Sequence, residues 1–353
     1  MIEVGLVGFG LAGKSFHAPV IRAVPSLRLS AIVQRTGDEA AQLYPDVRVV
    51  RSLDELLAIS AIQLVVIATP NQTHFPFAAR CLEAGRDVVV DKPMTTTLEE
   101  AKELYEIAER RGRLLTVYHN RRFDADFQAI RAVLASGDLG RMVRFESFYD
   151  RFRPASKPGA WREKPEPGSG VLFDLSPHLI DQALTLFGAP DSIYADVRIE
   201  REGFKTDDAF DLFLHYPGKL RVQLSATMLG LVPRPRFRVS GTKGGLVKAE
   251  FDPLEPTLRA GNIPAEGSWV LEKEDGFAEL TLVQDGQTAT RKVPSVGDWR
   301  DFYANVRDVL LDKAELLVTP PQVLDVMLAL ELAKVSSERQ KVVAWGEESL
   351  SSV

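Results

Sequence analysis

The amino-acid sequence predicts an α/β fold, with an amino-terminal doubly wound Rossmann domain followed by an α+β domain that holds a large, mostly antiparallel sheet. Over the first 120 residues, apolar runs alternate with helical patterns, which is typical of parallel strands covered on both faces. After residue 122, shorter strand-like runs alternate in polarity between turn residues, as in an antiparallel sheet. We therefore expect domains at 1–121 and 122–353, with room for the last helices to pack back on the first domain.

The first domain alternates strands and helices in a regular order. Ser52 and Thr97 each lie three residues before a glutamate, which is the capping-box pattern that starts a helix. Pro19 removes a backbone hydrogen bond and should kink or restart the first helix near His17. The expected strands lie at residues 3–7, 29–33, 47–50, 64–68, 88–90 and 114–118.

The second domain begins with a helix at 124–136 and a strand at 142–151. The segment 152–170 is rich in proline, glycine and charge, and a loop of that length is usually functional or mobile. A helix at 171–187 follows, and helices at 298–311 and 321–337 end the domain. Further strands are expected at 192–199, 209–215, 220–227, 236–240, 246–250 and 278–283.

Composition excludes several classes of protein. The 353 residues carry a net charge of −6, which argues against nucleic acid as the main partner. No apolar stretch approaches the roughly 18 residues that a membrane span needs. Cys81 is the one cysteine, so the chain has no disulfide framework, and no residue cluster has the spacing of metal ligands. A cytoplasmic protein without a metal centre is expected.

Three glycines follow the first strand with the spacing Gly8-x-Gly10-x-x-Gly13. This pattern indicates a tight turn and a helix whose amino-terminal N–H groups bind the phosphates of a dinucleotide. The same letters, continued by Lys14 and Ser15, also match the phosphate loop of nucleotide hydrolases. The candidate phosphate-binding residues are Gly8, Gly10, Leu11, Ala12 and Gly13.

The hydrolase alternative requires an acid at a strand end to hold magnesium. Asp91 follows an apolar strand, but Lys92 and Pro93 come immediately after it, and nothing in the later half resembles hydrolase machinery. The pattern therefore favours the dinucleotide interpretation.

The end of the second strand indicates which dinucleotide is bound. An NAD-binding domain usually places an acid there, on the ribose hydroxyls, whereas this chain has Arg35 and Thr36. Arg35 can bind a 2′-phosphate in a planar fork, and Thr36 can add a hydroxyl. We therefore expect NADP, with NAD less favoured; Asp38 is the one residue of the loop that could still serve as the ribose acid.

Ligands of an open α/β sheet gather outside the carboxyl ends of its strands. His119 is as well explained by burial as by a place beside the cofactor, and Asn71 by capping the next helix. His17, on the first helix, is a candidate to face the cofactor phosphates. The cofactor-binding candidates at the later strand ends are Thr69, Pro70, Asn71, His74, Asp91, Lys92, His119 and Arg121.

These segments resemble the glucose–fructose oxidoreductase, inositol dehydrogenase and rhizopine catabolism (Gfo/Idh/MocA) family, over nearly the whole chain. The motifs that carry the resemblance are the glycine turn, Ala68-Thr-Pro-Asn71, Asp91-Lys-Pro93 and Asp174-x-x-x-His178. Within the family, the chain is most similar to NADP-dependent scyllo-inositol dehydrogenases. It departs from the usual Glu-Lys-Pro by having Asp91, a conservative change because the lysine carries the chemistry.

The resemblance implies a catalytic trio of Lys92, Asp174 and His178, and the residue types suit the oxidation of an alcohol. His178 can exchange the hydroxyl proton near neutral pH, and Lys92 can stabilise negative charge on the same oxygen. Which of the two takes the proton directly stays open. Asp174, one helical turn before His178, can orient the imidazole or bind a neighbouring hydroxyl.

Pro177 should lie in the first turn of its helix, where missing N–H groups are tolerated. This predicts a helix that begins no earlier than about Phe173, with Asp174 and His178 near its positive end, which would favour a neutral imidazole.

The expected substrate is a polyol or sugar, which needs several hydrogen-bond partners. Beside the catalytic trio, the candidates to contact it are Arg151, Arg153 and Trp161, together with Arg162. An NADPH-dependent reductase of a ketosugar or aldehyde is the alternative, and a dinucleotide-binding sensor without turnover is the alternative of another class.

A homodimer or homotetramer is expected through the carboxy-terminal sheet. One face of that sheet is left open by its helices, and apolar side chains that alternate out of 211–215 and 220–227 would have to be covered there.

Overall fold

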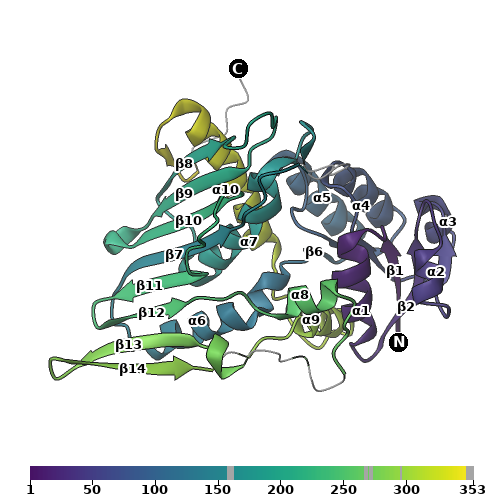
Figure 1. Cartoon of the computed structure of the whole chain (residues 1–353). Coiled ribbons are helices and arrows are strands. Elements are labelled where there is room, and N and C mark those ends of the chain that lie inside the picture. Colours follow the sequence, from purple (N-terminus) through teal and green to yellow (C-terminus); the bar gives the residue numbers. More distant parts are fainter. Residues whose placement is uncertain (157–162, 266–268, 270–272, 295, 347–353) are drawn as a thin grey trace. The chain divides into compact units, whose positions relative to one another are not determined.

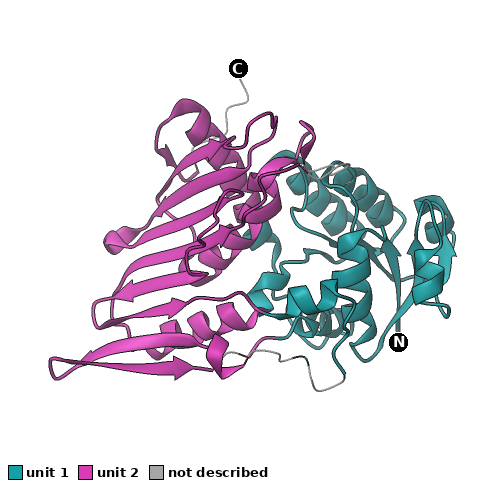
Figure 2. Ribbon diagram, in the orientation of Figure 1, with its two compact units in different colours: residues 1–123, 253–269, 298–324 teal, residues 124–252, 270–297, 325–353 magenta. Residues whose placement is uncertain are grey.

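The computed structural model describes residues 1–156, 163–265, 269, 273–294 and 296–346. The chain forms two compact units (Figure 2). Unit 1 comprises Met1–Phe123, Pro253–Trp269 and Asp298–Leu324, and unit 2 comprises Asp124–Asp252, Val270–Gly297 and Asp325–Val353. The first crossing therefore lies two residues from the expected boundary, and the chain then returns twice to unit 1.

Unit 1 is built on a parallel sheet whose order, over the described residues, is β3-β2-β1-β4-β5-β6 (Figure 1). Val65, Val66 and Val89 are fully buried, as expected for strands covered on both faces. The order reverses between β1 and β4, so the carboxyl ends of these two strands form the topological switch point where ligands bind. The strands are β1 (Ile2–Val7), β2 (Leu27–Val33), β3 (Arg48–Val50), β4 (Leu64–Ile67), β5 (Asp87–Val90) and β6 (Leu115–Val117).

Two helices of unit 1 begin at the caps that the sequence indicated. Ser52 caps α3 (Leu53–Leu57) and Thr97 caps α5 (Leu98–Arg111), and each hydroxyl accepts the N–H of a glutamate three residues on, at 3.2 Å. The others are α1 (Ala18–Arg22), α2 (Glu39–Leu43), α4 (His74–Glu83), α8 (Leu254–Arg259) and α9 (Arg300–Leu310).

The first helix restarts at His17, as predicted from Pro19. Residues Gly13–His17 form a π-helical turn, and the N–H of Ala18 donates to the carbonyl of Gly13, five residues back. The α-helical course resumes at Ala18 with Pro19 in its first turn, where the missing N–H costs little.

Unit 2 holds a second sheet, whose described strands run in the order β14-β13-β12-β11-β7-β10-β9-β8-β15. Neighbouring strands are antiparallel except β7 and β10, which are parallel. The helices are α6 (Ala125–Ser136), α7 (Gly170–Phe187) and α10 (Pro320–Arg339). The strands are β7 (Met142–Asp150), β8 (Ser192–Arg198), β9 (Ala209–His215), β10 (Arg221–Thr227), β11 (Phe237–Gly241), β12 (Gly244–Lys248), β13 (Ala278–Gln284), β14 (Gln287–Val293) and β15 (Val343–Ala344).

The open face of β8, β9 and β10 is more polar than expected. The apolar residues Leu212, Leu214, Val222 and Leu224 are fully buried on the side where α7 packs. The opposite side carries the paired residues Asp211 and Ser225, whose hydroxyl donates to the carboxylate at 2.5 Å. Phe213 also lies on this face, with its ring centre 6.3 Å from that of Tyr194, so the premise of apolar side chains here holds at Phe213 and fails at Asp211 and Ser225. The oligomer itself stays a prediction.

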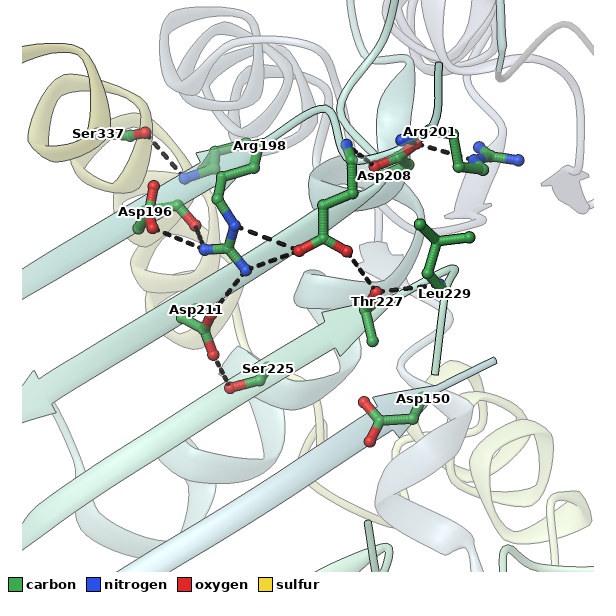
Figure 3. A network of polar contacts seen from close by, with 12 residues as sticks. Asp150, Asp196, Arg198, Arg201, Asp208, Asp211, Ser225, Thr227, Leu229 and Ser337 are labelled. Atoms are coloured by element: carbon green, nitrogen blue, oxygen red, sulfur yellow. Dashed lines mark hydrogen bonds and ion pairs between the residues drawn. The ribbon is translucent and has the colours of Figure 1, made fainter. Parts of the chain in front are cut away.

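Arg198 is the centre of a charged network on this face (Figure 3). Its guanidinium contacts the carboxylates of Asp196 at 2.7 Å, Asp211 at 2.9 Å and Glu200 at 3.2 Å. Glu200 also accepts a hydrogen bond from the hydroxyl of Thr227 at 2.7 Å. Because one cation faces three carboxylates, the network leaves this part of the sheet acidic.

Candidate active site

In the glycine turn, backbone segments of unit 1 lie in close contact with one another. Gly8 has φ +100°, a conformation that favours glycine, and a Cβ on it would lie 2.4 Å from the carbonyl oxygen of Ala68. A Cβ on Gly13 would lie 2.1 Å from the oxygen of Gly8. A Cβ on Gly10 would meet nothing within 4 Å. Gly8 and Gly13 are thus required by the fold, whereas Gly10 faces open space.

That open space fits the phosphates of a dinucleotide. Leu11, which is 44% exposed, and Ala12 begin the helix directly after Gly10, and the first N–H groups of a helix have no partner within the helix. The backbone at Gly10–Gly13 would therefore hold a pyrophosphate, as the spacing predicts.

In the loop after β2, Arg35 is exposed, whereas Asp38 forms a salt bridge. Arg35 and Thr36 are exposed. Asp38, the alternative ribose ligand, forms a salt bridge with Arg51 at 2.9 Å, and Arg51 also donates to the carbonyl oxygens of Gln34 and Gly37. Arg51 thus braces the loop and neutralises its acid, which suits a cofactor that carries a phosphate there.

The residues after β4 are linked to the loop after β5 by a buried histidine. Thr69 is half-buried, Pro70 is exposed and Asn71 is buried at the start of a short 3₁₀ turn. His74 has no exposed surface; its Nδ1 lies 2.8 Å from the carbonyl oxygen of Pro93 and its Nε2 2.9 Å from that of Thr69. Burial lowers the pKa of His74. Both its ring nitrogens are occupied, so we assign it to supporting these loops.

Asp91 and Lys92 lie at the end of β5, and the Lys92–Pro93 peptide bond is cis. Oδ1 of Asp91 accepts the backbone N–H of Lys92 at 2.8 Å. Burial alone would raise the pKa of Asp91, but His17, with a smaller contribution from Lys92, lowers it below its ordinary value. The carboxylate is therefore charged beside the candidate catalytic lysine.

His17, the candidate to face the cofactor phosphates, is fully buried. Its Nδ1 lies 2.6 Å from the hydroxyl of Tyr303 on α9, and its Nε2 lies 3.8 Å from Oδ2 of Asp91. Its ring packs on Tyr118, with centroids 4.3 Å apart. Sequence reasoning missed Tyr303, which carries no motif.

His119 and Arg121, after β6, are both buried. Arg121 forms a salt bridge with Glu255 on α8, and its guanidinium lies 5.3 Å from the ring centre of Trp299. These contacts tie the segment after β6 to the parts of unit 1 supplied late in the chain.

Asp174 and His178 lie one turn apart on α7, in unit 2, and His178 is 8% exposed. The helix expected at 171–187 begins one residue earlier, at Gly170, whereas the later start near Phe173 inferred from Pro177 was wrong, because α7 carries Pro177 in its interior. Pro177 cannot donate to the carbonyl of Phe173. His178 is thus eight residues beyond the helix start, where the dipole of the amino-terminal end has little effect on its charge.

Asp207 holds the start of α7. Its backbone carbonyl accepts the N–H of Val171 at 2.9 Å and its carboxylate accepts that of Leu172 at 2.6 Å. Gly170 has φ +86°, and a Cβ there would lie 2.0 Å from Oδ1 of Asp207. This clamp supplies the N–H partners that let the helix begin three residues earlier than Pro177 suggested.

The loop candidates for substrate binding differ in position. Arg151 is half-buried and its guanidinium lies 5.5 Å from the ring centre of Tyr149. Arg153 is exposed, and its backbone bonds to Met228 and Arg201. Trp161 and Arg162 lie outside the described residues.

The described residues show neither a metal-binding group nor a membrane-spanning helix. They contain no group of three or more histidine, cysteine, aspartate or glutamate side chains arranged to bind a metal. Likewise, none of the described helices has the length and apolar character to cross a bilayer.

Comparison with protein families matches both parts of the chain. A model described as "Oxidoreductase family, NAD-binding Rossmann fold" (GFO_IDH_MocA) matches residues 2–119, and the "GFO/IDH/MocA C-terminal domain" matches residues 127–247. This result favours the dinucleotide turn over the phosphate loop of a hydrolase.

Individual relatives match over the whole length. The uncharacterized oxidoreductase YdgJ of Escherichia coli K12 is 42% identical over 96% of this chain and 97% of its own. The scyllo-inositol 2-dehydrogenase (NADP(+)) IolW of Bacillus subtilis is 35% identical over 97% of this chain and 95% of its own. The solved structure of YvaA from Bacillus subtilis has a TM-score of 0.93 at 34% identity, covering 97% of this chain and 98% of that one.

The geometry of the glycine turn predicts opposite effects for two substitutions. Gly13→Ala should lower the free energy of unfolding by about 2 kcal/mol or more, because its methyl group meets a backbone oxygen. Gly10→Ala should leave stability within about 1 kcal/mol but raise the Kd for the cofactor by roughly 10-fold or more, since the methyl enters the phosphate space. Urea unfolding and cofactor titration measure both. Wild-type cofactor affinity in Gly10→Ala would contradict the assignment.

Asp207 should make stability depend on pH. Burial, helped by the neighbouring Asp208, raises its pKa from 3.8 to about 6. Since the folded protein then binds a proton that the unfolded chain has lost, the free energy of unfolding should fall as pH rises from about 4 to about 6. Asp207→Asn keeps an acceptor for Leu172 and should remove about 2 kcal/mol of this fall, measured by urea unfolding at both ends of the range. Asp275→Asn, at an exposed site, is the control and should behave as wild type.

Proposed function

The chain belongs to the GFO/IDH/MocA family of oxidoreductases, and on this basis we propose that it transfers a hydride between a secondary alcohol of a polyol or sugar and NADP. The observation that carries the proposal is the position of Lys92, at the carboxyl end of β5 in the sheet whose β1 ends in the glycine turn. An ammonium group therefore lies at the edge of the sheet where a dinucleotide binds.

The nicotinamide, when bound, supplies the acceptor for the hydride. We assign His178 to exchanging the proton of the reacting hydroxyl, and Lys92 to stabilising negative charge on its oxygen by a charge-assisted hydrogen bond. The charged Asp91 beside Lys92 favours the ammonium form that this role requires. Asp174 is assigned to orienting His178 or to binding a neighbouring substrate hydroxyl.

The proposed preference for NADP rests on the loop after β2. Arg35 is exposed there, and the two nearby acids, Asp38 and Glu39, form salt bridges with Arg51 and Lys14. The relative IolW is named as an NADP(+)-dependent scyllo-inositol dehydrogenase, which agrees in cofactor and supports an inositol-like polyol as the substrate class. Arg151, Arg153 and Trp161 stay candidates for contacting that substrate.

We also propose a cytoplasmic location and a homodimer or homotetramer. A single buried cysteine suits a reducing compartment. Assembly through the open face of the unit 2 sheet would join polar surfaces, which fits an interface held by charged contacts more than an apolar one. Light scattering that shows only a 39.1 kDa species would contradict the oligomer.

The roles of Lys92 and His178 predict large losses of turnover. Lys92→Ala and His178→Ala should each lower kcat by ~10² or more, measured as NADPH absorbance with a panel of polyols that includes inositols. Lys102→Ala and His215→Ala, outside the candidate site, are the matched controls and should keep the wild-type rate. If both active-site variants turned over normally, the assigned chemistry would be wrong.

Arg35 predicts a selective effect on the cofactor. Arg35→Asp should raise the KM for NADP by roughly 10-fold or more, because a carboxylate repels the 2′-phosphate, while the KM for NAD stays unchanged or falls. Arg48→Asp, an exposed basic residue on β3, controls for the loss of positive charge in general. Equal weakening of both cofactors by Arg35→Asp would count against phosphate binding at this position.

A further inference from the structure

Unit 1 contains a buried polar chain that leads from α9 to Lys92. Tyr303, on α9, contacts Nδ1 of His17 at 2.6 Å. Nε2 of His17 lies 3.8 Å from Oδ2 of Asp91, and Oδ1 of Asp91 accepts the backbone N–H of Lys92. Tyr303 and His17 have no exposed surface, and the side chain of Asp91 is 16% exposed. Polar groups placed this deep are costly unless they are paired, so their alignment calls for an explanation.

The neighbours of His17 indicate where its proton lies. Nε2 faces Oδ2 of Asp91, a carboxylate oxygen that only accepts, so we place the imidazole hydrogen on Nε2 and assign the hydroxyl of Tyr303 as the donor to Nδ1. A neutral imidazole whose Nδ1 accepts must carry its own hydrogen on Nε2, the nitrogen that faces Asp91. Along the polar chain from Tyr303 through His17, the O–H and N–H dipoles therefore point toward the carboxylate of Asp91.

Asp91 needs this arrangement because it is a largely buried acid. Burial opposes its ionisation, and hydrogen bonding to His17, which needs an N–H but no charge on the imidazole, is the largest contribution that lowers its pKa. The charged carboxylate then holds the backbone of Lys92 through one oxygen while facing His17 with the other. Loss of the imidazole would leave a buried carboxylate with fewer partners, and the segment that carries Lys92 would be free to shift.

We propose that His17, oriented by Tyr303, is a positioning residue that acts through Asp91 to hold Lys92 in place. The inference rests on the function proposed for Lys92 and adds two residues to it. This role requires no contact between His17 and the cofactor or the substrate. The π-helical turn Gly13–His17 gives this role a structural basis, since it ends at the imidazole that the chain requires.

Packing alone offers a competing explanation. The ring of His17 stacks on Tyr118 at 4.3 Å and lies 6.2 Å from the ring of Tyr303, so an aromatic residue without nitrogen could fill the same space. The two explanations differ in what His17→Phe should do, because phenylalanine keeps the ring and removes both nitrogens.

The first test compares kcat and KM among variants of this chain. His17→Phe should lower kcat by about 10-fold with KM values within about 3-fold, because displacement of a catalytic group by a fraction of an ångström affects the chemical step most. His17→Gln restores a donor near Nε2 and should recover part of the loss. Tyr303→Phe should resemble His17→Phe, whereas Tyr105→Phe, which removes a buried hydroxyl on α5, is the control and should retain wild-type kcat. Wild-type kcat in His17→Phe would overturn the proposal.

The second test asks whether His17 acts through Asp91. If it does, His17→Phe and Asp91→Asn should each cost about 10-fold in kcat, and the double variant should also cost about 10-fold. Independent effects would multiply to about 100-fold, and that outcome would overturn the proposal.

A third measurement is independent of activity and of any variant's folding. The ¹H–¹⁵N spectrum of the histidine rings in the wild-type protein should show His17 with its hydrogen on Nε2 and none on Nδ1. A hydrogen on Nδ1 would overturn the proposed chain even in an active enzyme. If Lys92→Ala instead kept the wild-type rate while the spectrum showed the Nε2 form, the proposed function would fail and the polar chain would stand.

Discussion

The close approach of the glycine turn to the end of β4 is the constraint on which the rest of unit 1 depends. Gly8 and Gly13 each leave no space for a Cβ, because the backbones of Gly8 and Ala68 fill it. This contact brings the amino-terminal end of the first helix to the switch point of the sheet, where β4 and β5 also end. The cofactor space, the Asn71 segment and Lys92 are consequently fixed by main-chain packing, while the side chains refine their positions.

Much of the fold could be predicted from the sequence because its signals are local. Runs such as Leu64–Ile67 are apolar on both faces, which only a covered parallel strand requires. The return of 298–324 to unit 1 lies within what was allowed for the last helices, but the return of 253–269 was not foreseen, since that segment differs in no obvious way from its surroundings. β14 was missed although Asp285 and Gly286 form its two-residue turn, because six of its seven residues are exposed and show no apolar alternation.

The candidate site likewise has residues that the sequence could indicate and residues that it could not. Lys92 and His178 stand in short motifs, so the sequence could propose both. The contact between His17 and Tyr303 joins residues 286 positions apart, and neither has a neighbour that reveals the other. The start of α7 inferred from Pro177 was misplaced for a related reason: Pro177 is a local signal, whereas Asp207, which allows the helix to begin earlier, lies 30 residues away, beyond β8.

The late segments of unit 1 have a consequence for how the protein is made. Phe16 packs on Trp299, Thr116 donates to the carbonyl of Val318, and Arg122 donates to that of Leu317. Residues 1–123 are therefore synthesised first, but the core of unit 1 is complete only after residues 299–318 have been synthesised. A gene fragment that encodes residues 1–123 alone would yield a product with bare apolar surface and unmatched polar groups, and nascent chains would depend on chaperones until the far end emerges.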